Sequence, residues 1–305
     1  MTSVLITGAS GFIGGAVTER LLSQGNVQVR GLTSHPAKNR FGDRVRSFAY
    51  DFERPERMAD AFSGADVFVS SYYVRFNYGG LTFEQAVERT RALIAQARAG
   101  GVRKIVHVSV SNASESSDLP YYRNKGRIER LVRESGLVYT ILRPALVIGR
   151  GDILVNNIAY FLRRLPVFTI FGRGDYRLQP ITVDAFAGII VEAANGAHPN
   201  ATLGVAGPSD WTFRRLVDAI RSTVGSRAAI VRAPAFVALA GLKAAGAFLH
   251  DVVLTPDEVR GLTREYLYSE RPLRRGADFA EWLADPAIAS TLGVVYASEL
   301  ERHFR

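Results

Sequence analysis

A tyrosine and a lysine four residues apart are the pair in this sequence best suited to acid–base chemistry. In Tyr121-Tyr122-Arg123-Asn124-Lys125, the spacing Tyr-x-x-x-Lys would place a phenol and an ammonium on one helix face, one turn apart. A nearby cation favours phenolate and lowers the pKa of a tyrosine from about 10 toward neutral pH. An exposed tyrosine beside a lysine is a common arrangement, so the surrounding residues must show whether the pair is catalytic. With them, the pair predicts that Tyr121, assisted by Lys125, is the acid and base for a carbonyl or an alcohol.

Two serines at the end of the preceding apolar run could supply a hydroxyl to the same reaction. Side chains alternate along a strand, so Ser109 and Ser111 face one side and Val110 the other. Ligands bind at the carboxyl ends of strands in open α/β sheets, which favours Ser111 as the group that hydrogen-bonds the substrate oxygen. Ser109 is the alternative. If Ser111 takes this role, we expect Ser109 to pack beside the nucleotide cofactor that a glycine-rich stretch near the start of the chain predicts.

A glycine-rich stretch near the start predicts a dinucleotide site. Thr7-Gly8-Ala9-Ser10-Gly11-Phe12-Ile13-Gly14 follows a short apolar run and opens an amphipathic one. Glycines permit a tight turn and close backbone approach, and a helix N-terminus offers free N–H groups to a pyrophosphate. The position between a strand and a helix makes the motif specific.

The residues after the second apolar run favour NADP(H), with NAD(H) as the alternative. An NAD site usually carries an acidic residue about 20 positions beyond the glycines. No Asp or Glu occurs from residue 20 to 42, and Thr33 and Ser34 are followed by Lys38 and Arg40. Hydroxyls and cations suit a 2′-phosphate, so we expect Thr33 and Ser34 to bind the cofactor.

Taken together, these motifs resemble the short-chain dehydrogenase/reductase superfamily in its extended or atypical branch, including epimerase-like and complex-I-subunit-like members. The resemblance covers about residues 1–205. The residues that carry it are Thr7 to Gly14, Asp51-Phe52, Val106 to Ser111, Tyr121 with Lys125 and Glu129, Leu142-Arg143-Pro144, and Gln179 to Asp184.

The resemblance implies further binding roles. The residues expected at the pyrophosphate are Gly8, Ser10, Gly11, Phe12 and Ile13. Asp51 and Phe52 would lie against the adenine, Lys125 would bind the nicotinamide ribose, and Pro144 would lie near the carboxamide. Ser70, also expected at the cofactor, opens Ser70-Ser71-Tyr72-Tyr73, whose bulk departs from the family's small residues and would narrow the nicotinamide site.

Alternating apolar runs and amphipathic stretches must position these groups. Five runs predict buried parallel strands: Val4–Ile6, Val27–Leu32, Val67–Val69, Ile105–Val108 and Tyr139–Leu142. Helical spacing predicts helices over Phe12–Leu22, Phe83–Ala97, Lys125–Val132 and Val183–Asn195. This order predicts an α/β doubly wound parallel Rossmann sheet with a smaller, mostly helical C-terminal substrate lobe.

The expected domains follow from this order. Residues 1–150, with a return segment at about 180–205, form the dinucleotide-binding domain, and 151–179 with 206–305 form the substrate lobe. Aromatic residues after Gly149 would line the pocket there: Tyr160, Phe161, Phe168, Phe171 and Tyr176.

Composition narrows the classes of function. The chain has 305 residues, no cysteine and a net charge of +9, carried by scattered arginines rather than by a basic run. We therefore expect no nucleic-acid partner, and the histidines show no metal-ligand spacing, so we expect no metal. The apolar run within Ala233–Leu249 stops at Lys243, too short for an integral membrane segment. A cytoplasmic protein, with a small-molecule substrate and a homodimeric state, is the expectation.

Three functions are compatible with these motifs. The first is an NADP(H)-dependent oxidoreductase that uses Ser111, Tyr121 and Lys125 on a ketone or secondary alcohol of a small molecule. An aromatic lining of the pocket would favour an apolar or aromatic substrate. The second is an NAD(P)-dependent nucleotide-sugar epimerase or dehydratase, with Arg150, Arg163, Arg164, Arg173 and Arg177 available for a substrate pyrophosphate. The third is a non-catalytic NADP(H)-binding sensor or assembly protein. Retention of the tyrosine and the lysine favours an enzyme.

Overall fold

All five strands expected from the apolar runs are present in the computed structural model, which describes residues 2–234, 246, 249–298 and 300. They are β1 (Thr2–Thr7), β2 (Val27–Thr33), β4 (Val67–Ser70), β5 (Lys104–Val108) and β6 (Val138–Pro144). Every residue of β4 and β5 is buried, as are the last five of β1, because helices cover both faces of a parallel sheet.

Two further strands complete the sheet of the first unit, which comprises Met1–Pro144 and Val183–Val205. They are β3 (Val45–Ala49), beyond β2, and β11 (Ala201–Ala206), beyond β6. The order β3-β2-β1-β4-β5-β6-β11 is joined by parallel pairs throughout. The direction of winding reverses between β1 and β4, where ligands bind in doubly wound sheets. The predicted α/β doubly wound fold is confirmed.

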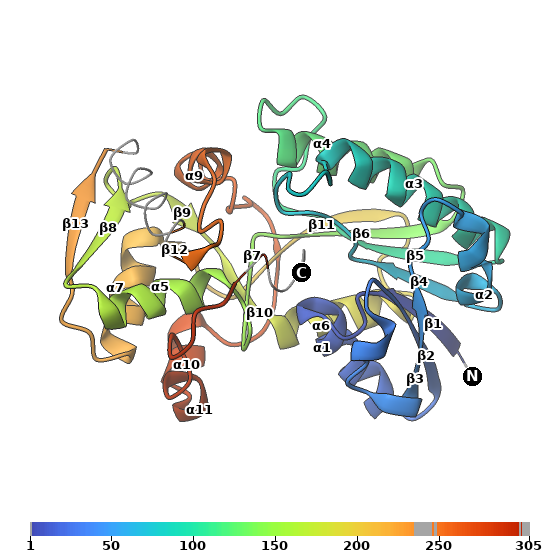
Figure 1. Cartoon of the computed structure of the whole chain (residues 1–305), viewed down its shortest axis with the longest axis horizontal. Coiled ribbons are helices and arrows are strands. Elements are labelled where there is room, and N and C mark those ends of the chain that lie inside the picture. Colours follow the sequence, from blue (N-terminus) through green and yellow to red (C-terminus); the bar gives the residue numbers. More distant parts are fainter. Residues whose placement is uncertain (1, 235–245, 247–248, 299, 301–305) are drawn as a thin grey trace. The chain divides into compact units, whose positions relative to one another are not determined.

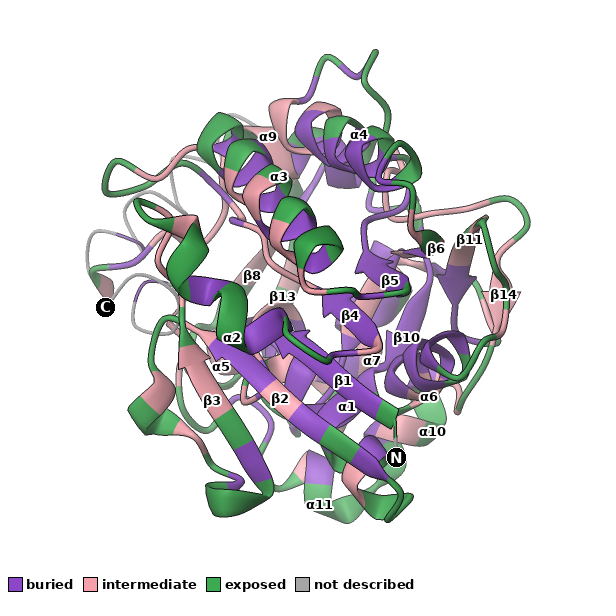
Figure 2. Ribbon diagram, turned by 90° about the vertical axis from the view of Figure 1, so that its right-hand side faces the viewer, coloured by how far each residue is buried: buried purple, intermediate pink, exposed green. Residues whose placement is uncertain are grey.

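Helices cover this sheet on both faces. Figure 1 shows α1 (Phe12–Ser23) and α6 (Val183–Ala194) together on one face, with α3 (Phe83–Ala99) and α4 (Pro120–Arg133) on the other. The short α2 (Ala59–Phe62) packs against α3. Figure 2 shows the buried residues of β1, β4 and β5 between these helices. Three single 3₁₀ turns, η1 (Pro36–Lys38), η2 (Gly42–Arg44) and η3 (Pro55–Met58), connect the strands at the β3 edge.

The second unit comprises Ala145–Thr182 and Ala206–Arg305. Among its described residues, the helices are α5 (Leu154–Arg164), α7 (Phe213–Thr223), α9 (Pro256–Thr263), α10 (Phe279–Ala284) and α11 (Pro286–Ala289). Its short strands are β7 (Leu146–Ile148), β8 (Val167–Phe171), β9 (Arg177–Leu178), β10 (Pro180–Thr182), β12 (Trp211–Thr212), β13 (Ala229–Ala233) and β14 (Leu273–Arg274).

One apolar core holds the second unit together. Residues from α5, such as Val155 and Ile158, share it with Leu216 and Ile220 from α7.

The unit boundaries lie at 144, 182 and 205, against the expected 150, 179 and 205. Most of the apolar run within 233–249 lies outside the described residues. Among the residues that the structure describes, no helix is long and apolar enough to cross a membrane.

Candidate active site

The glycine-rich loop connects β1 to α1 in a tight turn. Gly8 has a φ of +66°, and its N–H donates to the carbonyl of Leu32 at the end of β2 (2.8 Å). The N–H of Gly11 then donates back to the Gly8 carbonyl (2.8 Å). An L residue at position 8 would be strained by this backbone conformation. The turn therefore depends on glycine.

A second glycine lets the helix approach the loop closely. A Cβ at Gly14 would collide with the carbonyl of Gly8. The Thr18 hydroxyl donates to the Gly14 carbonyl (2.8 Å), and it also lies 3.0 Å from the Ala9 carbonyl oxygen. Thr18 was not predicted as part of the site, although a buried hydroxyl one turn after the glycines is a usable signal.

The start of α1 fits a pyrophosphate. Its N-cap, Gly11, has no side chain to cap the helix, and the first turn carries no acidic residue. The first i→i−4 bond runs from Gly15 N–H to the Gly11 carbonyl, so the N–H groups of Phe12 and Ile13 precede the helical ladder. Directed N–H groups without a competing carboxylate are what an anionic group requires.

The loop after β2 carries exposed polar groups beside this helix. Ser34 is exposed, and the Thr33 hydroxyl accepts from the N–H of His35 (3.2 Å). Arg40 pairs with Glu19 of α1 (2.8 Å), both side chains being at least half exposed, and its guanidinium lies against Gly15. Hydroxyls and one partly neutralised cation therefore lie at the end of β2.

Asp51 and Phe52 follow β3. The Asp51 carboxylate caps the next turn by accepting from the N–H of Arg54 (2.9 Å) and lies 3.7 Å from the Arg57 guanidinium. Phe52 stacks on Tyr50 with ring centres 5.0 Å apart, while the Arg89 guanidinium lies 4.8 Å from the Phe52 ring centre. Phe52 thus belongs to an aromatic cluster at this edge of the sheet.

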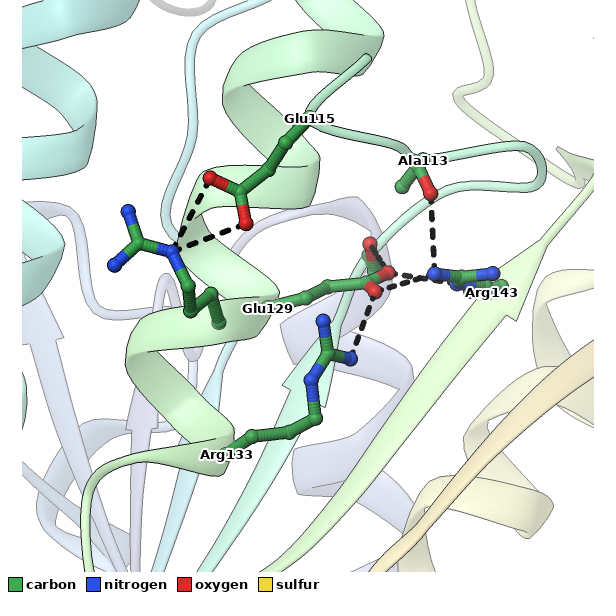
Figure 3. A network of polar contacts seen from close by, with 7 residues as sticks. Ala113, Glu115, Glu129, Arg133 and Arg143 are labelled. Carbon is green, nitrogen blue, oxygen red and sulfur yellow. Dashed lines mark hydrogen bonds and ion pairs between the residues drawn. The ribbon is translucent and has the colours of Figure 1, made fainter. Parts of the chain in front are cut away.

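A buried carboxylate connects the end of β5 to β6 and α4. Glu129 has no solvent exposure, accepts from the Ser109 hydroxyl (2.6 Å) and pairs with Arg143 of β6 (Nε to Oε1, 2.7 Å). Arg133 approaches the second carboxylate oxygen at 3.2 Å. Figure 3 shows this network together with the bond from Arg143 to the Ala113 carbonyl. The Ser109 hydroxyl is thereby engaged in structure, which the strand pattern alone could not reveal.

Ser111 is fully buried two residues further along. Its N–H donates to the carbonyl of Pro144 at the end of β6 (3.0 Å), which brings these two predicted residues together. The following segment packs tightly on α4, because a Cβ at Gly126 would overlap the backbone of residues 114 and 115. The loop that carries Ser111 is therefore fixed to both β6 and α4.

Tyr121 and Lys125 lie on α4, which begins at Pro120 rather than at the predicted residue 125. Lys125 is buried, and its Nζ donates to the carbonyl of Val108, the last residue of β5 (3.2 Å). Burial lowers the pKa of Lys125 to about 7, against a smaller raising effect of Glu129. Tyr121 is half-buried one turn before.

The remaining predicted residues near β4 and β5 are in the core. Ser70 is fully buried, and its hydroxyl lies 3.4 Å from the Nδ1 of His107. Burial, followed by the charge of Lys125, lowers the pKa of His107, so its imidazole is neutral. The ring centre of Tyr73 lies 4.2 Å from the Nζ of Lys125, a contact that the sequence did not predict.

In the second unit, the aromatic residues expected in the pocket separate into different clusters. Tyr160 and Phe161 contact Tyr296, whereas Tyr176 stacks on Phe213 at 5.4 Å. Phe171 packs with Val259, so no single aromatic wall forms among these described residues.

The arginines available for a second pyrophosphate mostly have protein partners. Arg163 donates to the carbonyl of Leu292 (2.9 Å) and Arg164 to that of Val294 (2.7 Å). Arg177 pairs with Glu265 (2.6 Å) and Arg173 with Asp175 (2.6 Å). These four guanidinium groups therefore already have partners within the unit.

The match of this chain to a known protein family begins at the glycine-rich loop. Residues 8–151 match an NAD(P)H-binding family. The mitochondrial NADH dehydrogenase (ubiquinone) 1 alpha subcomplex subunit 9 of Arabidopsis thaliana is 26% identical over 289 residues, covering 88% of this chain and 71% of that protein. An NAD(P)H azoreductase of Xenophilus azovorans is 26% identical over 228 residues, 73% of this chain and 74% of the relative.

The fold is also similar to that of solved structures. The NADPH-dependent quinone oxidoreductase QOR2 of Escherichia coli, solved with NADPH, superposes with a TM-score of 0.70. It is 24% identical, and the match covers 88% of this chain and 91% of that one.

Proposed function

This chain belongs to the NAD(P)H-binding, atypical and extended branch of the short-chain dehydrogenase/reductase family, and on that premise we propose that it is an NADP(H)-dependent oxidoreductase for the carbonyl of a small molecule. The observation that carries the proposal is the buried Lys125 at the carboxyl end of β5, one helical turn from Tyr121. Burying an ammonium is costly, and such groups concentrate at functional sites.

In this proposal each group has one task. Tyr121 gives its phenolic proton to the carbonyl oxygen during reduction and takes it back during oxidation. The Lys125 charge stabilises the phenolate that remains, and Ser111 donates a hydrogen bond to the developing oxyanion. Bound NADPH supplies the hydride.

The nucleotide would be held along the carboxyl edge of the sheet. The proposed pyrophosphate contacts are the backbone of Gly8 and Gly11, the N–H groups of Phe12 and Ile13, and the hydroxyl of Ser10. Thr33, Ser34, Asp51 and Phe52 would surround the adenosine, and Ser70, Lys125 and Pro144 would lie at the nicotinamide end. Ser109 would pack beneath it, with its hydroxyl on Glu129.

A preference for NADPH over NADH follows from the end of β2. Ser34 is exposed there, and no carboxylate occurs from residue 20 to 42. A 2′-phosphate would meet hydroxyls and the cations Lys38 and Arg40, the second of which is paired with Glu19.

A conjugated carbonyl such as a quinone is the proposed substrate class. Tyr121 lies among the aromatic rings of Tyr73, Phe83 and Tyr122, with ring centres 5.2 to 6.0 Å away. Such rings favour flat apolar acceptors over sugars. Two of the similar proteins are named as quinone and azo reductases.

The test is NADPH oxidation, followed at 340 nm, with a panel of quinones, aromatic ketones and nucleotide sugars. We expect turnover with a quinone or aromatic ketone, and a loss of about 10²–10⁴ in kcat for Tyr121→Phe with NADPH affinity unchanged. Conversion of a nucleotide sugar without net NADPH consumption would support the epimerase alternative. Tight NADPH binding with no turnover of any acceptor would instead favour a sensor or assembly protein.

A further inference from the structure

Tyr73, three residues after β4, contacts both residues of the proposed acid–base pair. Its ring centre lies 4.2 Å from the Nζ of Lys125 and 5.3 Å from the ring centre of Tyr121, to which it is nearly perpendicular (80°). Its hydroxyl lies 3.3 Å from the Tyr121 carbonyl oxygen and donates to it. One side chain from outside α4 therefore connects two residues within α4.

Other residues hold the Tyr73 ring in place. Phe83, the first residue of α3, stacks on it at 6.0 Å with an interplanar angle of 11°. The Phe83 N–H is fixed in turn by the Asn77 side chain (2.9 Å). Burial, with smaller contributions from Tyr121 and Glu84, raises the pKa of Tyr73, so its hydroxyl stays neutral and can donate.

Lys125 needs such a contact because the other groups that face it compensate little. The Val108 carbonyl accepts one of its hydrogen bonds, Glu129 lies one turn further along α4, and His107 of β5 is neutral. The face of an aromatic ring attracts a cation, most strongly where water is excluded. Tyr73 supplies that face.

We propose that Tyr73 is a positioning residue of this site, whose ring retains the Lys125 side chain as an ammonium at the end of β5 and fixes the orientation of Tyr121. Its effect on turnover rests on the oxidoreductase function proposed above. Its effect on Lys125 does not, since the contact exists within the protein.

The titration of Lys125 tests the contact directly, by NMR of protein labelled with ¹³C at the lysine ε-carbon. The sequence contains only Lys38, Lys104, Lys125 and Lys243, so the spectrum of Lys125→Arg identifies the relevant signal. Tyr73→Phe keeps the ring and should leave the pKa of Lys125 unchanged. Tyr73→Leu removes the ring and should lower this pKa by about 0.4–1.5 units.

Tyr72→Leu is the matched control, because Tyr72 packs on Phe52 and bonds to Arg89 instead of Lys125. It should leave the pKa of Lys125 unchanged, which separates the ring contact from general loosening of the loop. If Tyr73→Leu does not fold, Tyr73→Met replaces it with a side chain of intermediate size.

If the protein turns over, the kcat–pH profile of Tyr73→Leu should shift in the same direction as the NMR titration, while Tyr73→Phe retains the wild-type profile. An unchanged or raised Lys125 pKa in Tyr73→Leu, or in Tyr73→Met where it replaces that variant, overturns the inference. A lowered pKa in a protein without turnover would support the contact and remove only the proposed function.

Discussion

At the scale of single residues, the two serines after β5 have different surroundings. The Ser109 hydroxyl donates to the buried Glu129, whereas Ser111 lies beside the end of β6. This separation could not be read from the sequence, because both serines face the same side of an extended strand. The bond to Glu129 counts against Ser109 as the hydroxyl that meets the substrate.

Alanine at each position should therefore produce opposite effects. Ser109→Ala should lower the free energy of unfolding by about 1.5–3 kcal/mol, the usual contribution of a hydrogen bond to a charged group, and leave kcat nearly unchanged. Ser111→Ala should lower kcat by about 10²–10³ with unchanged NADPH affinity. Urea denaturation and steady-state kinetics measure the two quantities. A large loss of kcat in Ser109→Ala alone would transfer the catalytic role to Ser109.

Lys125 should give the protein a distinct dependence of stability on pH. Burial lowers its pKa to about 7, from an ordinary value of 10.5. Between these values the unfolded chain binds one more proton than the folded chain, so this residue makes stability rise with pH from about 7, by up to about 1.4 kcal/mol per unit. Below pH 7 both states hold the proton and the contribution is constant.

Lys125→Met should remove this part of the pH dependence. Denaturation of both proteins from pH 6 to 9 measures the difference, and the advantage of the Met variant should be largest at pH 6 to 7. A constant difference across the range would mean that Lys125 titrates normally in the folded protein.

At the scale of elements, the central strands were predictable because burial on both faces produces continuous apolar runs. The nucleotide loop was predictable because its glycines lie between a strand and a helix. The edge strand β3 was missed, since Arg46 and Ser47 interrupt its pattern and only Val45 is buried. The start of α4 was placed late, although Pro120 at its first turn is a usual start signal. Contacts between distant residues, such as Tyr73 with Lys125, are set by packing and leave no local pattern.

Two adjacent glycines of α1 should respond differently to alanine. A Cβ at Gly14 would meet the rigid Gly8 carbonyl, whereas at Gly15 it would meet the mobile end of Arg40. Gly14→Ala should thus destabilise the loop and weaken NADPH binding more than tenfold. In Gly15→Ala the gain in helix propensity, about 1 kcal/mol, should offset the cost to stability of displacing Arg40, and the loss of NADPH affinity should be the smaller of the two. Calorimetric titration with NADPH compares them, and equal affinities would show that the loop tolerates the collision.

At the scale of the whole molecule, the chain passes between its two units three times, at residues 144, 182 and 205. The segment 145–182 carries α5, whose apolar face packs against α7 from the later part of the sequence. Neither part of the second unit therefore has a complete core without the other.

A chain that ends at residue 205 should aggregate, because it retains α5 but lacks α7. Replacing residues 145–182 of this fragment by a short Gly-Ser linker should restore a soluble first unit, with size-exclusion chromatography as the measurement. A monomeric, cooperatively folding 1–205 fragment would contradict the division of the core.

The position of Glu129 affects how natural and engineered sequence variation should be read. Its carboxylate links the loop that carries Ser111, strand β6 and helix α4 without reaching the surface. In a saturation mutagenesis screen, positions 129 and 143 should therefore be as intolerant as positions that touch a ligand. Losses in Glu129 and Arg143 double variants should be smaller than the sum of the single losses, because both disrupt one network. A map of intolerant positions would consequently extend from the pocket into the interior behind α4.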